Sequence, residues 1–430
     1  MVKTTLAANL SLALTALWAI AAHDAQEQAP ATEKLIEQLG SKEFAERERA
    51  KRLLQARGPS VLPALRQALA DPALDLEVRR RIEQMIPPLE AAAALEPKRV
   101  SLKAGKKPLA AVLKEIEGQT GFKVLAGDDE MEIALHDALD KMPFWEALER
   151  IGERTGRAIS VVGVRQGLWL AKRSVHPSLI NVKGPFRLEV TRFHEDRDID
   201  FAQMGSDRKP RRDNLLTLTL SLLAEPRLII LGLEPAQVQL AVDEHGKSLS
   251  VPTSVPAMLE TRAREDFQHT AQILLHRSSQ KAKTIQILRG TIPVRIAVER
   301  RPIVVTNELL SSTGTKFKIG GDSFEVTRAE KTEGGHRIDI AIPPTPDADM
   351  ARFSWFDRVR VEDAKGNALK PSSTGTTGSV TLAGTVCHEI SLTFAQSKDP
   401  TIGPPKRLIM EDWHILHHKV PFEFKDVPLP

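Results

Sequence analysis

The sequence has 430 residues, of which 41% are hydrophobic and 27% charged, and its formal net charge is +4 at pH 7. This composition excludes extended disorder. The chain is longer than a single hydrophobic core of ordinary size can organise, so we predict about three or four folded domains. So small a charge over this length argues against a nucleic-acid-binding protein. The densest basic stretch, DRKPRRD at 207–213, is predicted to be a solvated loop.

The first residues show the pattern of a secretory signal peptide. Lys3 precedes an apolar run from Leu6 to Ala22, and Ala19-Ile20-Ala21 offers the small residues of a cleavage site. The run falls short of the ~20 apolar residues that a spanning helix needs, and an uncleaved N-terminal anchor is the alternative. We expect a signal peptide at 1–22, a periplasmic or secreted protein, and no membrane span in the mature chain.

A single cysteine, Cys387, lies in a strand-like run, GTVCHEISLTF. One cysteine allows no intrachain disulfide, whatever the compartment. We predict that Cys387 is a small buried hydrophobe rather than a reactive thiol.

Residues 32–95 are predicted to be helical throughout. Gly40 ends a first short helix, Gly58-Pro59 breaks the chain before a third, and Asp71-Pro72 precedes the last. That last helix carries an apolar stripe at helical spacing, made of Leu74, Val78, Ile82, Met85 and Ile86. Short paired helices with proline in a turn resemble HEAT or armadillo repeats over about 32–89. Stacked repeats usually need three or more units to be stable, so we expect this helical segment to be stabilised by contacts with the next domain.

Two stretches of the next segment repeat one another. KPLAAVLKEIEGQTG at 107–121 and MPFWEALERIGERTG at 142–156 align without a gap, pairing Pro, Leu, Ile, Thr and Gly at equivalent positions. Each copy has proline near its first turn, apolar residues at helical spacing and a terminal glycine, which predicts a helix. Short strands precede and follow each helix, so we predict a small α/β domain (βαβ-βαβ) at 97–175, with both helices on one face of a small mixed sheet.

This segment resembles a known family. VSLKAGKKPLAAVLKEIEGQTGFKVLAG and EIALHDALDKMPFWEALERIGERTG are similar to the secretin and TonB short N-terminal (STN) domain over about 98–173. In that family the module is a periplasmic docking or signalling piece attached to an outer-membrane pore or receptor. The residues that follow are too few, and their strands too charged, for such a pore. The resemblance therefore implies a docking module without the pore, and an envelope protein as its partner.

From Leu179 onward, where no family is recognised, alternating runs between Gly, Pro, Asp and Asn predict β-strands. Three pairs of segments recur in the same order: LEVTR (188–192) with FEVTR (324–328), DEHGKSL (243–249) with DAKGNAL (363–369), and IPVRI (292–296) with VPFEF (420–424). We predict two tandem β-sandwiches of immunoglobulin-like size, at 179–301 and 302–430; chance recurrence of common strand patterns is the alternative. We expect no charged or aromatic cluster in them that would act as a binding hot spot.

Two motifs could indicate a metal site or a hydrolase active site, but the residues around each argue against it. His414, His417 and His418 are close in sequence, but their neighbours predict a strand, in which His414 and His418 share a face and His417 points away. No carboxylate-histidine motif accompanies them, so we predict no metal site. The Gly-Asp-Ser within GGDSF, 320–324, resembles serine hydrolases but lacks the glycines of an oxyanion pocket, and we predict a turn into a strand.

The fold class predicted is therefore multi-domain α+β: a short helical repeat, a small α/β docking domain and two β-sandwiches. The sequence has no phosphate loop, nucleophile elbow, dinucleotide-binding glycine pattern or paired-cysteine zinc site. We expect an exported, non-enzymatic cell-envelope protein that acts as a docking adaptor or assembly factor, with no catalytic residues and no cofactor. The alternatives are a periplasmic metal-dependent hydrolase that uses His414, His417 and His418, and a periplasmic ligand-binding protein.

Overall fold

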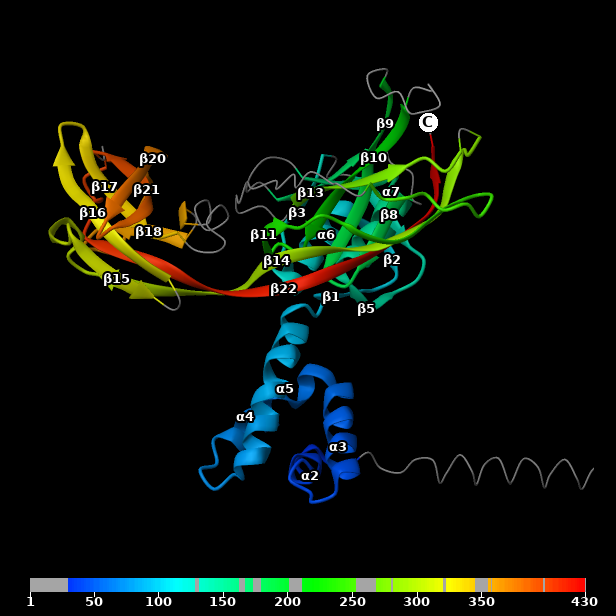
Figure 1. The fold of residues 1–430 in the computed structure, drawn as a ribbon, viewed down its shortest axis with the longest axis horizontal. Coiled ribbons are helices and arrows are strands. Elements are labelled where there is room, and N and C mark those ends of the chain that lie inside the picture. The colour runs from blue at the N-terminus through cyan, green and yellow to red at the C-terminus, as the bar shows by residue number, and fades with distance from the viewer. Residues whose placement is uncertain are drawn as a thin grey trace, which may run out of the picture. The chain divides into compact units, whose positions relative to one another are not determined.

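The computed structural model has N-terminal helices, small mixed sheets, and then larger antiparallel sheets (Figure 1). It describes residues 30–127, 131–161, 167–172, 179–200, 211–252, 268–279, 281–319, 322–344, 355–356, 358–396 and 399–429. The expected signal peptide at 1–22 and most of the basic stretch at 207–213 lie outside these ranges. Within them, no helix combines the length and apolar character needed to cross a membrane. The chain divides into two compact units, 1–96 and 97–430.

The first unit is helical, as expected. Its elements are α2 (Thr32–Gln38), α3 (Phe44–Ala56), the 3-10 helix η1 (Gly58–Val61), α4 (Leu62–Leu69) and α5 (Leu76–Ala94). The Asp75 carboxylate caps α5 by accepting hydrogen bonds from the N–H groups of Glu77 and Val78. The predicted stripe faces the core: Val78, Ile82 and Met85 are buried, and Leu74 and Ile86 pack beside them. The helix continues through Pro87 and Pro88, and both prolines are exposed. Because proline has no N–H, two carbonyls of the preceding turn lose their helical hydrogen bonds, and on this exposed side water can bind them instead.

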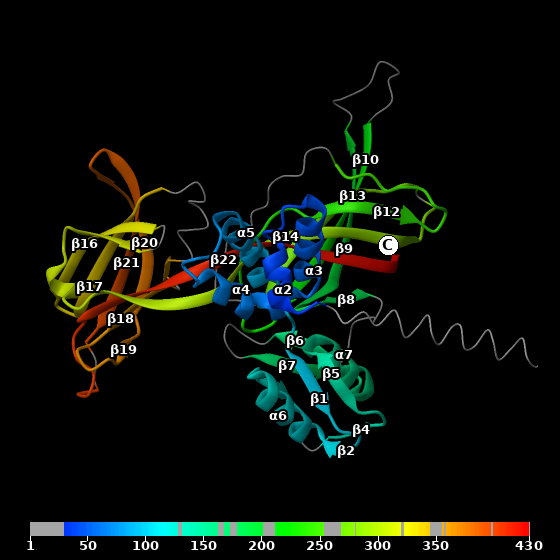
Figure 2. The ribbon, with the colours of Figure 1, turned by 90° about the horizontal axis from the view of Figure 1, so that it is seen from below.

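The second unit begins with the duplicated segment (Figure 2). Its elements are β1 (Arg99–Leu102), β2 (Gly105–Pro108), α6 (Leu109–Thr120), β3 (Val124–Ala126), β4 (Glu132–Leu135), β5 (Leu139–Pro143), α7 (Phe144–Thr155), β6 (Arg157–Val161) and β7 (Leu168–Lys172). The two helices have the same length and the same ends. Each follows a proline N-cap and stops at a glycine in the left-handed region, Gly121 at φ 78° and Gly156 at φ 64°. The structural repeat is therefore confirmed.

The strands of this segment differ from the expected single sheet. Each copy is β-β-α-β, because a short strand, β2 or β5, directly precedes each helix. The first strands of one copy pair with those of the other, β1 with β5 and β2 with β4, while β3, β7 and β6 form a separate three-stranded mixed sheet. This exchange between copies divides the strands into three small sheets around one core, which includes Leu113, Ile116, Leu148 and Ile151.

The rest of the second unit is β-sheet. Its first part contains β8 (Ile180–Lys183), β9 (Phe186–Asp200), β10 (Arg211–Ala224), β11 (Ile229–Leu233), β12 (Gln237–Asp243), β13 (Gln268–His276) and β14 (Thr284–Thr306). Its second part contains η3 (Leu309–Ser311), β15 (Thr315–Ile319), β16 (Asp322–Thr332), β17 (Gly335–Ile342), β18 (Val359–Glu362), β19 (Ala368–Leu369), β20 (Ser373–Leu382), β21 (Thr385–Ala395) and β22 (Arg407–Pro428).

These strands form sheets with matching orders. In the first part β13-β10-β9-β8 make one sheet, and in the second part β21-β17-β16-β15 run in the corresponding order, with β20 added at the edge. A third sheet, β11-β14-β22-β18-β19 with β12 also on β14, serves both parts. The strands described in it all pair antiparallel. The sheets are consistent with two β-sandwich domains, which we call the first and second sandwich.

Two of the three predicted segment pairs are structurally equivalent. LEVTR and FEVTR each carry a β-bulge at the threonine, Thr191 in β9 and Thr327 in β16, and each follows a hairpin with a two-residue connection. The residues of the second connection, 320–321, lie outside the described ranges. DEHGKSL and DAKGNAL form matching turns. The third pair is wrong: Ile292 and Val420 lie opposite one another in neighbouring strands.

The domain boundary predicted at 301/302 also needs correction. It falls inside β14, which pairs with the C-terminal strand β22 from Thr284 opposite Pro428 to Thr306 opposite Leu408. The end of the chain therefore returns to the first sandwich, and the two sandwiches are not separate in sequence (Figure 1). The immunoglobulin-like expectation holds only for size, because three consecutive strands, β8, β9 and β10, lie side by side, unlike the ABED sheet of that fold.

Candidate functional site

The duplicated segment is anchored to the first sandwich through α7. The indole Nε1 of Trp145, a fully buried side chain, donates to the Pro185 carbonyl at 2.9 Å. Leu223 of β10 belongs to the segment's hydrophobic core, and Val182 of β8 packs against it. The segment thus packs against the end of the sheet β13-β10-β9-β8 where Val182 and Leu223 lie.

Buried charges reinforce this anchor. Arg187 of β9 is 1% exposed; its Nε donates to Glu149 of α7 and its Nη1 to Glu189, both at 2.6 Å. Glu225, which is 0% exposed, accepts from the Lys98 N–H at 2.8 Å and from Arg227. Desolvation by burial raises the pKa of Glu225 despite these partners. A buried ion pair of this kind holds α7 in place on β9, because moving the two apart would leave a buried charge without its counter-charge, which costs free energy.

Several strands of the segment have a strand neighbour on one side only. Within the described residues, only β7 has a neighbour on both sides; β1, β2, β3, β4, β5 and β6 each pair along one edge. Side chains already bind some main-chain groups of β1 and β4: Gln119 bonds the N–H and C=O of Ser101, and Arg154 donates to the Ala134 carbonyl. The edges of β2, β3 and β6 are therefore the better candidates to accept another strand.

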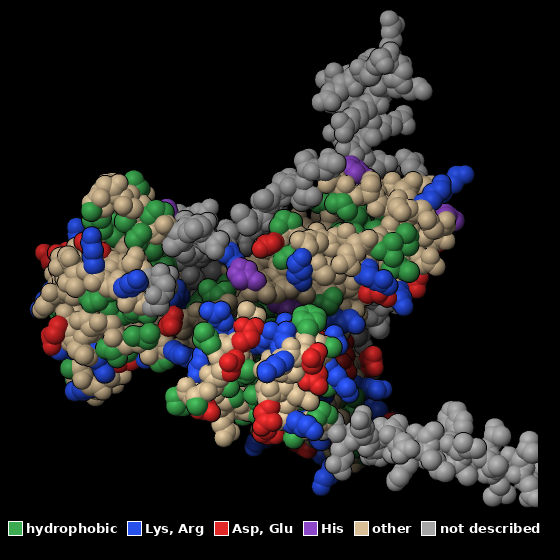
Figure 3. Space-filling view, turned by 60° about the horizontal axis from the view of Figure 1, so that its bottom comes forward, with side chains coloured by type: hydrophobic (Ala, Val, Ile, Leu, Met, Phe, Trp, Pro, Cys, Tyr) green, Lys and Arg blue, Asp and Glu red, His purple; other side chains and the backbone are tan. Residues whose placement is uncertain are grey.

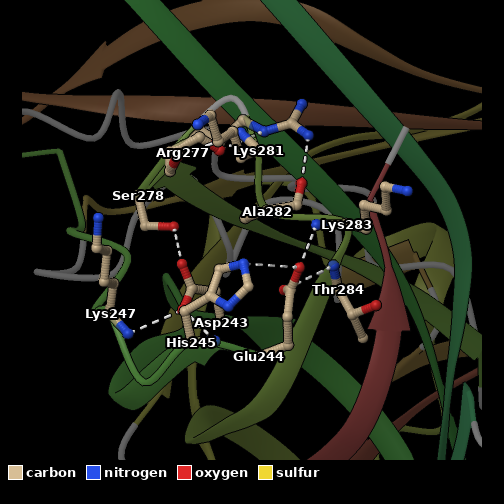
Figure 4. Close-up of polar contacts among 11 residues, drawn as sticks. Asp243, Glu244, His245, Lys247, Arg277, Ser278, Lys281, Ala282, Lys283 and Thr284 are labelled. Carbon is tan, nitrogen blue, oxygen red and sulfur yellow. Dashed lines mark hydrogen bonds and ion pairs between the residues drawn. The ribbon is translucent and has the colours of Figure 1, made fainter.

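The most concentrated group of polar side chains surrounds Asp243, at the end of β12 (Figure 4). Its Oδ1 accepts from the N–H groups of His245 and Lys247, both at 2.8 Å, and its Oδ2 accepts from the Ser278 hydroxyl at 2.6 Å. The Ser278 hydrogen bond, ahead of the backbone donors, lowers the pKa of Asp243. The neighbouring Glu244 accepts from the N–H groups of Lys283 and Thr284.

This group brings together Asp, His and Ser but does not form a catalytic triad. In a triad the histidine stands between the serine and the aspartate. Here Ser278 donates directly to Asp243, while the His245 imidazole points toward Glu244, with Nε2 at 3.7 Å from its Oε1 (Figure 4). The serine hydroxyl therefore lacks the histidine that stands between serine and aspartate in a triad.

The second sandwich repeats this turn without the serine or the histidine. Asp363 Oδ1 accepts from the N–H groups of Lys365 and Asn367 at 2.8 and 2.9 Å, and Oδ2 accepts from Gly403 N–H and Asn367 Nδ2. Gly246 and Gly366 occupy the same left-handed position, at φ 76° and 90°. The two copies share a buried aspartate that holds a turn. We therefore interpret the Asp243 group as a structural feature that stabilises this turn.

The three histidines lie on β22, as the strand prediction expects. His414 is exposed beside Glu299 and Arg301, whereas His418 is half-buried and stacks on Phe186 with ring centroids 5.6 Å apart. Burial lowers the pKa of His418. Among the described residues, no group of three or more His, Cys, Asp or Glu side chains is placed to hold a metal ion.

Cys387 is 3% exposed, and burial raises the pKa of its thiol, as in a small buried hydrophobe. The Gly-Asp-Ser motif contributes Asp322 and Ser323 to the start of β16, while its glycines lie outside the described residues.

The sequence analysis missed a cleft of about 700 Å³ in the first sandwich, contrary to the expectation of no charged cluster there. It is lined by residues of β8, β12, β14 and β22, and we call it the cationic cleft. Three cations, Lys183, Arg289 and Lys425, surround one carboxylate, Glu423. Arg289 Nε donates to Glu423 at 2.7 Å, which is the main reason why the pKa of Glu423 is lowered. No single stretch of sequence shows this cluster, because its members are far apart in the chain.

Elsewhere the charges are mixed. On the face seen in Figure 3, Lys and Arg side chains alternate with Asp and Glu, with no broad patch of one sign. Compared with known proteins, the chain matches no family model, no curated protein and no solved structure.

Proposed function

We propose that this chain is an exported, non-enzymatic cell-envelope protein that acts as a docking adaptor or assembly factor through the segment at about 98–173. The resemblance of that segment to the STN domain supports this proposal, as does the resemblance of about 32–89 to HEAT-type repeats, since both are protein-binding modules. The observation that carries it is the set of unpaired strand edges on the segment. A partner strand added to such an edge gains main-chain hydrogen bonds, a recurring mode of peptide recognition.

The rest of the molecule supports a role for the segment as a rigidly held unit. Trp145 and Arg187 fix α7 against the first sandwich, so a partner bound to the free edges would be held in a defined orientation to the sandwiches. The Asp243 group, which superficially offers hydrolytic residues, is accounted for as a turn. A non-catalytic role is therefore the simpler account.

The anchor also decides how the proposal should be tested. Deleting the segment would uncover Leu223, remove Glu149 from Arg187 and remove the Lys98 N–H from Glu225, so the shortened protein would fail for structural reasons. A photo-crosslinking residue placed at single exposed positions avoids this problem. Lys123, just before β3, and Asp140, in β5, are exposed and suitable.

The matched control is the same crosslinker at Lys316 of β15, an exposed site in the second sandwich. In cells that make the protein, Lys123 and Asp140 are expected to give one discrete adduct with an envelope protein, and Lys316 none. The same adduct from Lys316, with none from the other two sites, would place docking on the sandwiches and refute the proposal.

A further inference from the structure

The cationic cleft is a second candidate binding site, and it lies outside the proposed docking segment. Asn181 and Lys183 of β8 form one wall, while Arg289, Glu423 and Lys425 come from the paired strands β14 and β22. Asn181 Nδ2 donates to the Glu423 carbonyl at 3.0 Å, which fixes β8 beside β22. The volume is within the range of about 300–1,000 Å³ that ligand sites occupy.

The charges of the cleft favour an anion. Glu423 is shared by Arg289, at 2.7 Å, and Lys425, at 3.6 Å, so one carboxylate faces two cations. Lys183 is exposed and makes no hydrogen bond or ion pair with any described residue. The cleft therefore has two positive charges in excess, and a bound anion would gain attraction without first breaking the Arg289 pair.

The spacing of these charges favours an extended ligand over a single small anion. Arg289 lies directly opposite Glu423, and Lys425 is two residues further along the same strand, or about 7 Å away. An extended peptide spaces alternate side chains by the same ~7 Å. Gln239 and Thr291 add neutral polar side chains to the lining. We propose that the cationic cleft binds an extended acidic peptide segment, with carboxylates at alternate positions.

The probe for this proposal is a short fluorescent peptide with Glu at alternate positions, titrated against the full mature chain. Two further ligands accompany it: the same peptide with Gln in place of Glu, and inorganic phosphate as a competitor. The test variant carries Lys183→Glu and Lys425→Glu. Both side chains are exposed, so the fold should survive. The control carries Lys318→Glu and Lys370→Glu, two exposed lysines of the second sandwich, and changes the net charge equally.

We expect the acidic peptide to bind the wild type and the control variant alike, more weakly as salt is raised, and the test variant at least about tenfold more weakly. The Gln peptide should not bind. Equal affinity for the test and control variants, equal binding of the Gln peptide, or phosphate binding tightly where the acidic peptide does not would each overturn the proposal. Because no partner protein takes part, the result is independent of the docking role of the segment at 98–173.

Discussion

Asp243 and Asp363 hold two turns of the same geometry in the two sandwiches. Each carboxylate accepts two main-chain hydrogen bonds through one oxygen, and each lies at the end of the corresponding strand, β12 or β18. The difference between them is the second oxygen. Asp243 Oδ2 accepts from a hydroxyl, that of Ser278, whereas Asp363 Oδ2 accepts from the Gly403 N–H and the Asn367 amide.

This difference predicts unequal effects of the same substitution. In Asp243→Asn the new amide can donate to Ser278, because a hydroxyl also accepts. In Asp363→Asn the amide would face the Gly403 N–H, which cannot accept, and the Asn367 amide, which could accept only by flipping and giving up its donation to the Thr401 carbonyl. Both variants should melt at a lower temperature than the wild type, and Asp363→Asn should lose several degrees more. Asp140→Asn, at an exposed position, is the control and should change little. A larger loss for Asp243→Asn would contradict this account.

His418 predicts a pH dependence of stability. Burial lowers its pKa in the folded chain, whereas the unfolded chain takes up the proton near the ordinary value of about 6.5. Its contribution to stability is therefore complete above about pH 6.5 and decreases as the pH falls through that value toward the lower folded pKa. His418→Phe keeps the stacking on Phe186 and removes the titration, so the melting temperature should fall less between pH 7 and about pH 5.

The duplicated helices predict equal sensitivity at equivalent positions. Leu113 and Leu148 are both buried, at 4% and 0% exposure, and either one changed to Ala should cost ~2 to 5 kcal/mol through lost burial and a cavity. Lys114→Ala and Arg150→Ala, at neighbouring exposed positions, should cost less than ~0.5 kcal/mol. Denaturant unfolding measures all four. A strong effect at one leucine and none at the other would break the equivalence.

The buried pair of Arg187 and Glu149 predicts a large coupling between α7 and β9. Arg187→Met removes the shared cation from Glu189, which is buried, and from Glu149, which is half-buried, and this should cost ~3 to 5 kcal/mol. Adding Glu149→Gln should recover part of that loss, and a double-mutant cycle measures how much. Arg289→Met breaks a pair whose arginine is 49% exposed and should cost ~1 kcal/mol or less. Equal losses for the two arginines would contradict the anchoring role.

The features that the sequence predicted are local ones. The proline and glycine ends of α6 and α7, their apolar stripes and the recurrence of LEVTR and FEVTR each depend on residues that are close in sequence. The additional strands β2 and β5 were missed because they are only four and five residues long, too short to show a periodic pattern.

The features that the sequence missed are pairings between distant strands. Nothing within IPVRI or VPFEF shows that the two strands lie side by side, since both patterns suit any half-buried strand. The cationic cleft was missed for the same reason, because its Lys183 and Lys425 come from opposite ends of the β-region and the sequence does not show that their strands are neighbours. The ion pair that anchors α7 to β9 was missed as well, because Arg187 and Glu149 look in the sequence like ordinary surface charges.

The most direct test of the docking role is hydrogen exchange of the full chain, free and in complex with the crosslinked envelope protein once that protein is purified. Strand addition ties up main-chain amides, so the account predicts slower exchange in peptides that contain β2, β3 or β6, and no change in β15, β16 and β17. Protection confined to the strands of the second sandwich, with exchange across 99–172 unchanged, would contradict the claim that this segment is the docking unit.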